Sequence, residues 1–230
     1  MTENKNKIPR HIAIMLGGND EWAKERNLAV ENGSIKCYEL LKNVPGWFFE
    51  KGVKEISFSL YLTNNYKKSE NDLAYLMKVT KNFLKENLPE FDQSGYKILL
   101  SGETNDLPGD LADVFKEAVS ATKDNSKGTM NFCFNYDGRN EIVEAVKKII
   151  DKKFETEQVS ESLIRKYLYQ NEIAYPDLIV SMAGLQTVSG FLLWQSADSE
   201  FISMNKYWPD FEKTDVDLIL NKYNKINKKI

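Results

Sequence analysis

The sequence predicts an α/β protein, with a six-stranded, mostly parallel sheet flanked by helices. Two observations support this class. Short apolar runs rich in β-branched and aromatic residues alternate with longer segments in which apolar residues recur every three or four positions. Turn-forming residues bound the short runs, which is typical of buried strands. In such a sheet, ligand sites are expected at the carboxyl ends of the strands, where loops and helix N-termini converge.

Six short runs are predicted as strands. They are residues 11–16 (HIAIML), 55–62 (EISFSLYL), 96–102 (YKILLSG), 129–136 (TMNFCFNY), 177–182 (DLIVSM) and 200–204 (EFISM). The first run is followed by Gly17 and Gly18 and then by a helix that opens on Asp20 and Glu21. A strand that turns through glycines into a helix is a usual place for backbone N–H groups to hold a phosphate. Here, however, two carboxylates stand where a phosphate favours cations.

Five amphipathic segments between these runs are predicted as helices. They are residues 34–51, 70–88, 110–124, 139–153 and 160–169. Pro89 and Pro176 follow helical runs and are expected to end them. The two ends of the chain, residues 1–8 and 224–230, are expected to be frayed.

Length and composition predict one domain that spans residues 1–230, because 230 residues, 42% of them hydrophobic, suffice for one well-buried core. A net charge of −3 and a pI near 5.5 give no field that would attract nucleic acid or an anionic membrane. We therefore expect no nucleic-acid partner and at most peripheral membrane contact. No run approaches the roughly 18 apolar residues of a membrane span. A cytoplasmic location is expected.

Metal-binding cysteine motifs are missing from the sequence. Cys37 and Cys133 stand far apart without a C-x-x-C pair, and the chain has one histidine, so a zinc site is improbable. Both cysteines are expected to be reduced and buried. His11, at the start of the first strand, is expected to be a hydrogen-bonded structural group.

Five blocks of sequence carry a resemblance to a known family. They are HIAIMLGGNDEWAKE, LYLTNNYKKSENDLAYLM, MNFCFNYDGRNEIVEAV, SGFLLWQSADSEF and WPDF. In this order and spacing, from Ile8 to about Phe211, they resemble the cis-prenyltransferase family, whose bacterial members make undecaprenyl diphosphate by adding isopentenyl units to farnesyl diphosphate. The resemblance implies a six-stranded parallel sheet, an elongated apolar tunnel for the growing chain, and a homodimer formed through the last strand and its neighbouring helices.

The chain departs from the family at the allylic diphosphate site. The family ends its first strand in an aspartate that organises Mg²⁺ and the diphosphate, and this sequence has Gly17 there. The diphosphate-binding arginine is replaced by Glu21, and a further arginine and histidine by Val30 and Ser34. The sequence is therefore interpreted as a divergent family member.

The isopentenyl site departs as well. Where the family carries Arg-x-x-Gly-Glu-x-Arg-x-Ser-Asn, this chain has Ser181, Gly184, Leu185, Thr187, Ser189 and Gly190. Of these, only Gly184 and Ser189 keep the family's identities. The arginine-glycine signature that usually closes the C-terminus is also missing from KINKKI. Each charge-assisted contact from an arginine is worth roughly 1.5–3 kcal/mol, so the loss of several cations forfeits micromolar affinity for a diphosphate. Chain elongation of the usual kind is therefore rejected.

The candidate site combines surviving and new residues. Catalytic candidates are Asp20, Glu21, Asn65 and Glu200, and substrate-binding candidates are Gly18, Asn19, Trp22, Lys68 and Ser189. By resemblance, Lys68 lies near the reacting phosphate, Asn65 keeps the family's asparagine, and Glu200 matches a glutamate that helps to hold Mg²⁺. The aromatic and aliphatic positions of the blocks are compatible with a tunnel lining, although core packing is favoured.

Asp20, Glu21 and Glu200 are predicted to form a replacement carboxylate set for Mg²⁺, because hard divalent cations take oxygen ligands and would restore positive charge where the arginines are lost. Class I terpene cyclases are similar in holding diphosphate through metal. The alternative is that Asp20 and Glu21 are ordinary N-terminal helix residues that suit the helix dipole.

Three functions remain open. The favoured one is an isoprenoid enzyme that acts on an allylic prenyl diphosphate with Mg²⁺ by cyclisation, hydrolysis or transfer to an unusual acceptor. The second is a catalytically silent subunit paired with an active homologue in a heterodimer. The third is a prenyl-lipid-binding protein. The surviving apolar positions and the new carboxylates favour the enzyme.

Overall fold

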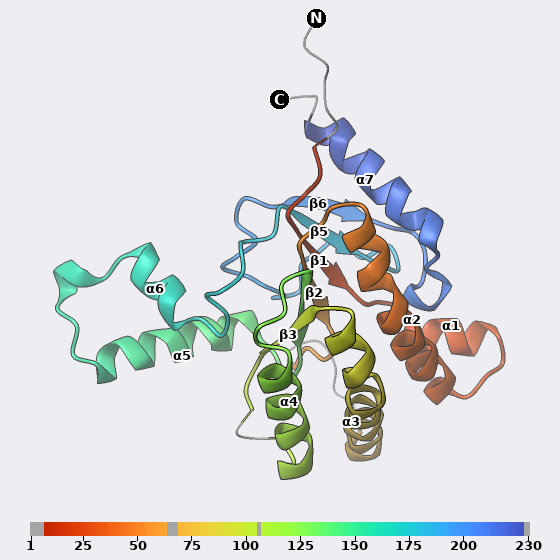
Figure 1. Cartoon of the computed structure of the whole chain (residues 1–230), viewed down its shortest axis with the longest axis horizontal. Helices are drawn as coiled ribbons and strands as arrows, with labels where there is room; N and C mark the ends of the chain where they lie inside the picture. The colour runs from red at the N-terminus through yellow and green to blue at the C-terminus, as the bar shows by residue number, and fades with distance from the viewer. Residues whose placement is uncertain (1–6, 64–68, 105–106, 228–230) are drawn as a thin grey trace, which may run out of the picture.

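A six-stranded parallel sheet forms the centre of the protein (Figure 1). The structure, a computed structural model, describes residues 7–63, 69–104 and 107–227. The strands lie in the order β3-β4-β2-β1-β5-β6, and they are β1 (His11–Met15), β2 (Glu55–Ser59), β3 (Tyr96–Ser101), β4 (Gly128–Cys133), β5 (Leu178–Ser181) and β6 (Glu200–Ser203). Every pairing in the sheet is parallel. The predicted fold class and all six predicted strands are confirmed.

Seven α-helices and two short 3₁₀ helices connect the strands in the part of the chain that the structure describes. They are α1 (Asn19–Glu25), α2 (Val30–Glu50), α3 (Glu70–Gln93), α4 (Gly109–Ala121), α5 (Gly138–Asp151), η1 (Thr156–Gln158), α6 (Glu161–Tyr167), η2 (Trp208–Asp210) and α7 (Lys213–Asn227). In Figure 1, α5 and α6 extend away from the body on one side, whereas α1, α2 and α7 lie on the other. None of the described helices has both the length and the apolar character to cross a membrane.

Both faces of the sheet are buried, as expected for parallel strands. Ile12 and Ile14 of β1 face the main core, which α2, α3, α4 and α7 cover. Ala13 and Met15 alternate with them and face a smaller cluster on the opposite side, which includes Phe191. All five residues of β1 and of β2 are buried. β1, which ends just before Gly17, is therefore packed on both faces.

The prediction that Pro89 ends its helix is wrong. α3 continues through Pro89 to Gln93, and Pro45 likewise lies inside α2. An interior proline costs about 3 kcal/mol or more, since it removes one backbone hydrogen bond. Phe91, in the turn after Pro89, is 1% exposed and packs in the main core. Its burial offsets much of that cost, so tertiary packing overrides the local signal.

The frayed C-terminal end is also wrong as far as Asn227. Residues 213–227 form α7, in which Val216, Ile219 and Tyr223 are buried at helical spacing. The helix therefore presents an apolar face to the main core, while its many polar residues face outward. Residues 1–6 and 228–230 lie outside the described residues.

Candidate functional site

The loops after β1 and β2 enclose a cavity at the carboxyl edge of the sheet. Its volume is about 90 Å³. We call it the strand-end cavity. Its lining residues are Met15, Leu16, Gly18, Asn19, Asp20, Glu21, Ser34, Ser59, Leu60, Tyr61, Leu62, Leu76 and Leu185. Leucine side chains make up much of this lining, and the first residues of α1 supply its polar part. The position agrees with the rule that ligands bind at the carboxyl ends of parallel strands.

Gly18 allows the chain to turn from β1 into α1. It has a φ of 82° and a ψ of 18°, in the left-handed region that glycine occupies readily. A Cβ atom on Gly18 would also come within 2.2 Å of the Tyr207 ring. The turn then closes with a hydrogen bond from the Trp22 N–H to the Gly18 carbonyl, 2.9 Å long. A glycine is therefore required here on two grounds, conformation and space.

Asn19, Asp20 and Glu21 line the strand-end cavity side by side along the chain. The side-chain oxygen of Asn19, Oδ1, is buried and finds no hydrogen-bond partner among the described residues. Asp20 and Glu21 occupy the first turn of α1, where negative charge suits the helix dipole. Their position therefore fits both a role as metal ligands and a role as ordinary N-terminal helix residues. The polar groups of the three side chains are oxygen acceptors, except for the NH₂ group of Asn19.

Glu200 does not join Asp20 and Glu21 within one chain. It is the first residue of β6 and pairs with Leu178, which pairs in turn with Ile12. Met15, by contrast, lies in the row of Ser181 and Ser203. Three residues of a parallel strand rise about 10 Å, so Glu200 is at the amino edge of the sheet and the start of α1 lies beyond the carboxyl edge.

The predicted three-carboxylate metal site, Asp20 with Glu21 and Glu200, is therefore wrong as a cluster within one chain. Over the described ranges, no group of three or more histidine, cysteine, aspartate or glutamate residues is arranged to hold a metal ion. Asn19, Asp20 and Glu21 all line the strand-end cavity.

Trp22 and Ser189, which were predicted to bind substrate, do not line the strand-end cavity. Trp22 is not among the residues that line the strand-end cavity, and its Nε1–H donates to Asp210 at 2.7 Å. Ser189 lies in a stretch of turns, residues 189–198, and has a φ of 48°. Its Oγ lies 3.0 Å from Thr187 Oγ1. The turns form because Leu192 also adopts a left-handed φ, which an α-helix excludes.

Two candidates, Asn65 and Lys68, lie outside the described residues. At the expected isopentenyl positions, Ser181 is fully buried at the end of β5, and Leu185 lines the strand-end cavity. Residues 181–190 include no lysine or arginine. This stretch of chain therefore supplies no cation for a second diphosphate.

A buried cluster of side chains between α2 and α3 lies next to Leu76, which lines the strand-end cavity; the sequence did not indicate this cluster. The Thr80 hydroxyl donates to the carbonyl of Leu76 at 2.8 Å, and the Tyr38 hydroxyl lies 2.5 Å from Thr80 Oγ1. The ring centroids of Tyr38 and Phe83 are 5.2 Å apart, and those of Phe83 and Phe132 are 6.3 Å apart. The side chains of Tyr38, Thr80 and Phe83 thus pack together between α2 and α3.

A second depression, the α2–α3 groove, lies between α2 and α3. It has a volume of about 360 Å³ and is lined by Ile35, Tyr38, Glu39, Lys42, Val79, Asn82, Phe83, Glu86 and Asn87. Tyr38 and Phe83 are 5% and 6% exposed. The two aromatic side chains are therefore the buried part of the groove lining.

The structural expectations for His11 and the cysteines are confirmed. The His11 Nδ1 is 2.7 Å from the Ala174 carbonyl oxygen, its Nε2 is 2.9 Å from Ser57 Oγ, and burial lowers the pKa of the imidazole. Cys37 and Cys133 are free and buried, and burial raises the pKa of the Cys37 thiol to about 12. These thiols are inert rather than nucleophilic.

Comparisons with known proteins agree with this architecture. The family described as "Putative undecaprenyl diphosphate synthase" matches residues 14–230. An isoprenyl transferase of Clostridium tetani is 35% identical over 228 residues, which cover 97% of this chain and 89% of the relative. A ditrans,polycis-undecaprenyl-diphosphate synthase, (2E,6E)-farnesyl-diphosphate specific, of Micrococcus luteus is 32% identical over 214 residues, which cover 91% of this chain and 86% of that enzyme.

A solved structure is similar over nearly the whole chain. Lavandulyl diphosphate synthase from Lavandula x intermedia, in complex with dimethylallyl diphosphate, superposes with a TM-score of 0.89 at 27% identity. The match covers 94% of this chain and 95% of the plant enzyme. Together with the family match over residues 14–230, these similarities show that the chain belongs to the undecaprenyl diphosphate synthase family, the cis-prenyltransferases, among the enzymes of isoprenoid biosynthesis.

Proposed function

We propose that this protein is an isoprenoid enzyme that acts on a single allylic prenyl diphosphate in the strand-end cavity, by cyclisation, hydrolysis or transfer to an acceptor other than isopentenyl diphosphate. The observation that carries the proposal is the lining of that cavity. Leu60, Leu62 and Leu76 offer an apolar surface for a prenyl chain, and Asp20 and Glu21 stand at the same cavity. An apolar pocket with a few polar groups at one place is the usual form of a small-molecule site.

Mg²⁺ is part of the proposal, with an altered set of ligands. Asn19 Oδ1, Asp20 and Glu21 would hold the ion, because a hard divalent cation takes oxygen ligands and the Asn19 oxygen lacks a partner among the described residues. The metal would supply the positive charge that a diphosphate needs beside two carboxylates. Glu200 is left out of this set, since the register of β5 and β6 places it at the far edge of the sheet.

A short substrate chain is favoured over a long one. Pockets that enclose drug-sized ligands measure roughly 300–1,000 Å³, whereas the strand-end cavity measures about 90 Å³. Beyond Leu76, the Tyr38–Thr80 pair and Phe83 occupy the space between α2 and α3. A geranyl group therefore fits the proposal better than a geranylgeranyl group.

The rejection of ordinary chain elongation rests on the second substrate site. Residues 181–190 include no lysine or arginine, and the side chains at the former arginine positions are Ser181 and Thr187. A diphosphate without cations to bind it is not positioned for condensation. The plant relative with bound dimethylallyl diphosphate supports the binding of a short allylic diphosphate by this fold.

A homodimer in the cytoplasm is proposed as the working form. Val143, Val146 and Ile150 form an apolar stripe on α5 and are 49%, 42% and 67% exposed. This helix extends away from the sheet in Figure 1, and β6 is an edge strand. An exposed apolar stripe and an open sheet edge both favour contact with a second chain.

The test is incubation of the purified protein with geranyl, farnesyl and geranylgeranyl diphosphate, with and without isopentenyl diphosphate and Mg²⁺. Released diphosphate and extractable products are both measured. We expect Mg²⁺-dependent release without isopentenyl diphosphate, fastest for the geranyl substrate. The double variant Asp20→Asn with Glu21→Gln should lose this release, while the control Glu117→Gln, an exposed acid on α4, should keep it.

Two outcomes would overturn the proposal. Longer prenyl products formed with isopentenyl diphosphate would show ordinary elongation. No release from a folded protein under any condition would favour a silent subunit or a prenyl-lipid carrier. A carrier would bind geraniol as tightly as geranyl diphosphate, and a silent subunit would raise the activity of an added homologue.

A further inference from the structure

The short helix α1 has little apolar anchorage of its own. It contains seven residues, and Ala23 is the one among them that is buried. Its first residues nevertheless form the polar part of the strand-end cavity. Because burial of one alanine stabilises a helix only weakly, the position of α1 must depend on other contacts.

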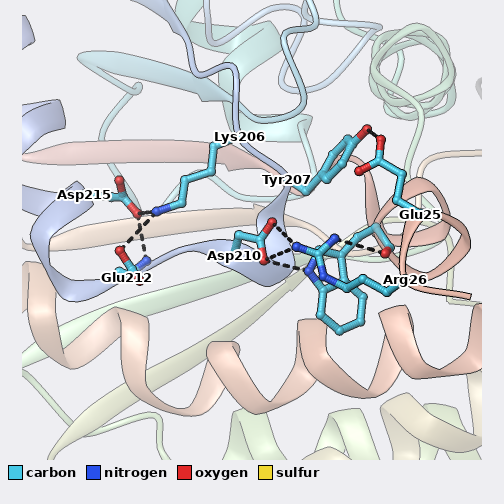
Figure 2. Close-up of polar contacts among 8 residues, drawn as sticks. Glu25, Arg26, Lys206, Tyr207, Asp210, Glu212 and Asp215 are labelled. Carbon is cyan, nitrogen blue, oxygen red and sulfur yellow. Dashed lines mark hydrogen bonds and ion pairs between the residues drawn. The ribbon is translucent and has the colours of Figure 1, made fainter. Parts of the chain in front are cut away.

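The start of α1 packs closely on Gly33 of α2, and Asp210, in the segment after β6, makes side-chain contacts with the middle and end of the helix. Its Oδ1 accepts a hydrogen bond of 2.7 Å from the Trp22 indole. The Arg26 guanidinium donates to both carboxylate oxygens of Asp210, at 3.0 Å and 3.1 Å, as Figure 2 shows. The same guanidinium lies over the Trp22 ring, 4.7 Å from the centroid. One carboxylate thus holds a residue in the middle of α1 and the residue just after it.

Tyr207 holds the two ends of α1 from the same segment. Its hydroxyl donates to Glu25 at 2.6 Å (Figure 2), and its ring fills the space beside Gly18. The next residue, Trp208, is fully buried and donates its backbone N–H to the Gly17 carbonyl at 2.9 Å. The segment is therefore fixed to the main core, and α1 is fixed to the segment.

We propose that Asp210 is a positioning residue, which clamps α1 through Trp22 and Arg26 and thereby fixes Asn19, Asp20 and Glu21 at the strand-end cavity. The proposal rests on the proposed function, because it takes this cavity as the reaction site. Asp210 also forms a bidentate ion pair with the guanidinium of Arg26, the residue that follows α1. Planar pairing and stacking on the indole are properties of arginine that lysine does not share.

Hydrogen exchange measured by mass spectrometry tests the clamp without any ligand. In Asp210→Ala, the amides of residues 18–27 should exchange about tenfold faster than in the wild type, since three hydrogen bonds are lost. The amides of β1 and α2 should not change. Asp210→Asn keeps an oxygen for the Trp22 N–H, so its effect should be smaller, about threefold.

Glu212→Gln is the matched control. Glu212 is two residues from Asp210 and forms an exposed ion pair with Lys206 at 3.3 Å, but it does not contact α1 (Figure 2). If Asp210→Ala and Glu212→Gln give the same exchange over residues 18–27, there is no clamp. A uniform increase over α1 and the sheet would mean a general loss of stability and would also overturn the proposal. Arg26→Gln repeats the test if Asp210→Ala does not fold.

The positioning role is tested by binding of geranyl diphosphate in Mg²⁺. Faster exchange of α1 should accompany a Kd about tenfold higher, with partial recovery in Asp210→Asn. Faster exchange with an unchanged Kd would show that α1 is held but not positioned for the ligand, which contradicts the proposal. If the wild-type protein binds no geranyl diphosphate, the proposed function fails, and the exchange data alone decide whether Asp210 fixes α1.

Discussion

The buried hydrogen bond between Tyr38 and Thr80 predicts an unequal cost for removing its two partners. Thr80 has one hydroxyl proton and donates it to the Leu76 carbonyl at 2.8 Å. The proton between the two hydroxyls therefore belongs to Tyr38, which donates to Thr80 Oγ1. Burial raises the pKa of the Tyr38 phenol, and the hydrogen bond to Thr80 lowers it by less than burial raises it.

Two single substitutions follow from this assignment. In Tyr38→Phe, Thr80 keeps its bond to Leu76, so the free energy of unfolding should fall by about 1 kcal/mol. In Thr80→Val, the Tyr38 hydroxyl is left buried without its acceptor, so the loss should be larger, about 2–3 kcal/mol. The double variant should cost less than the sum of the two, because no polar group is left unpaired between the helices.

Urea unfolding at neutral pH measures these differences, and Thr80→Ser serves as the control because it keeps the hydroxyl. The reasoning is refuted if Tyr38→Phe costs as much as Thr80→Val, or if the two costs simply add. Either result would mean that the Thr80 proton is not donated to Leu76.

Three further predictions concern the core, the cavity and the subunit contact. Burial lowers the pKa of His11, so below pH 6.5 the unfolded state binds more protons than the folded state. The free energy of unfolding should therefore fall there, by at most about 1.4 kcal/mol per pH unit, and His11→Gln should lack this slope. An imidazole pKa at or above 6.5, measured by NMR in the folded protein, would contradict the prediction. Phe83→Ala should cost about 3–5 kcal/mol and, by enlarging the α2–α3 groove that Phe83 lines, should shift substrate preference to longer prenyl diphosphates. Phe91→Ala, a similar loss outside both linings, should leave the preference unchanged. Val146→Asp should halve the mass measured by light scattering, and Val159→Asp, at an exposed site off the stripe, should not; an unchanged mass in Val146→Asp would argue against α5 as the contact.

The sequence predicted the sheet well because the strands are buried on both faces and read as continuous apolar runs. For the same reason it predicted where the Gly17–Gly18 turn lies, since a turn after β1 can lie only at the carboxyl edge of a parallel sheet. Pro89 and α7 were misread because their packing partners are distant in sequence. Phe91 contacts the main core after the proline, and Tyr223 does so near the end of the chain.

The composition of the site was harder to predict. Glu200 begins a strand, whereas Asp20 follows one, so the parallel pairing of the strands places these two residues at opposite edges of the sheet. Matching single residues to a family does not show at which edge they lie. Tyr38 and Thr80 lie on different helices, and neither residue signals in sequence that it faces the other. Asp210 was likewise unremarked, because its partners Trp22 and Arg26 are 188 and 184 residues away.

The shallow burial of α1 has an evolutionary consequence. Since Ala23 is its one buried residue, most positions of α1 can be exchanged without opening a hole in the main core. The α1 side chains that line the strand-end cavity are thus separable from those that make the protein stable. Side chains at this edge of the cavity can therefore change by mutation at almost constant stability.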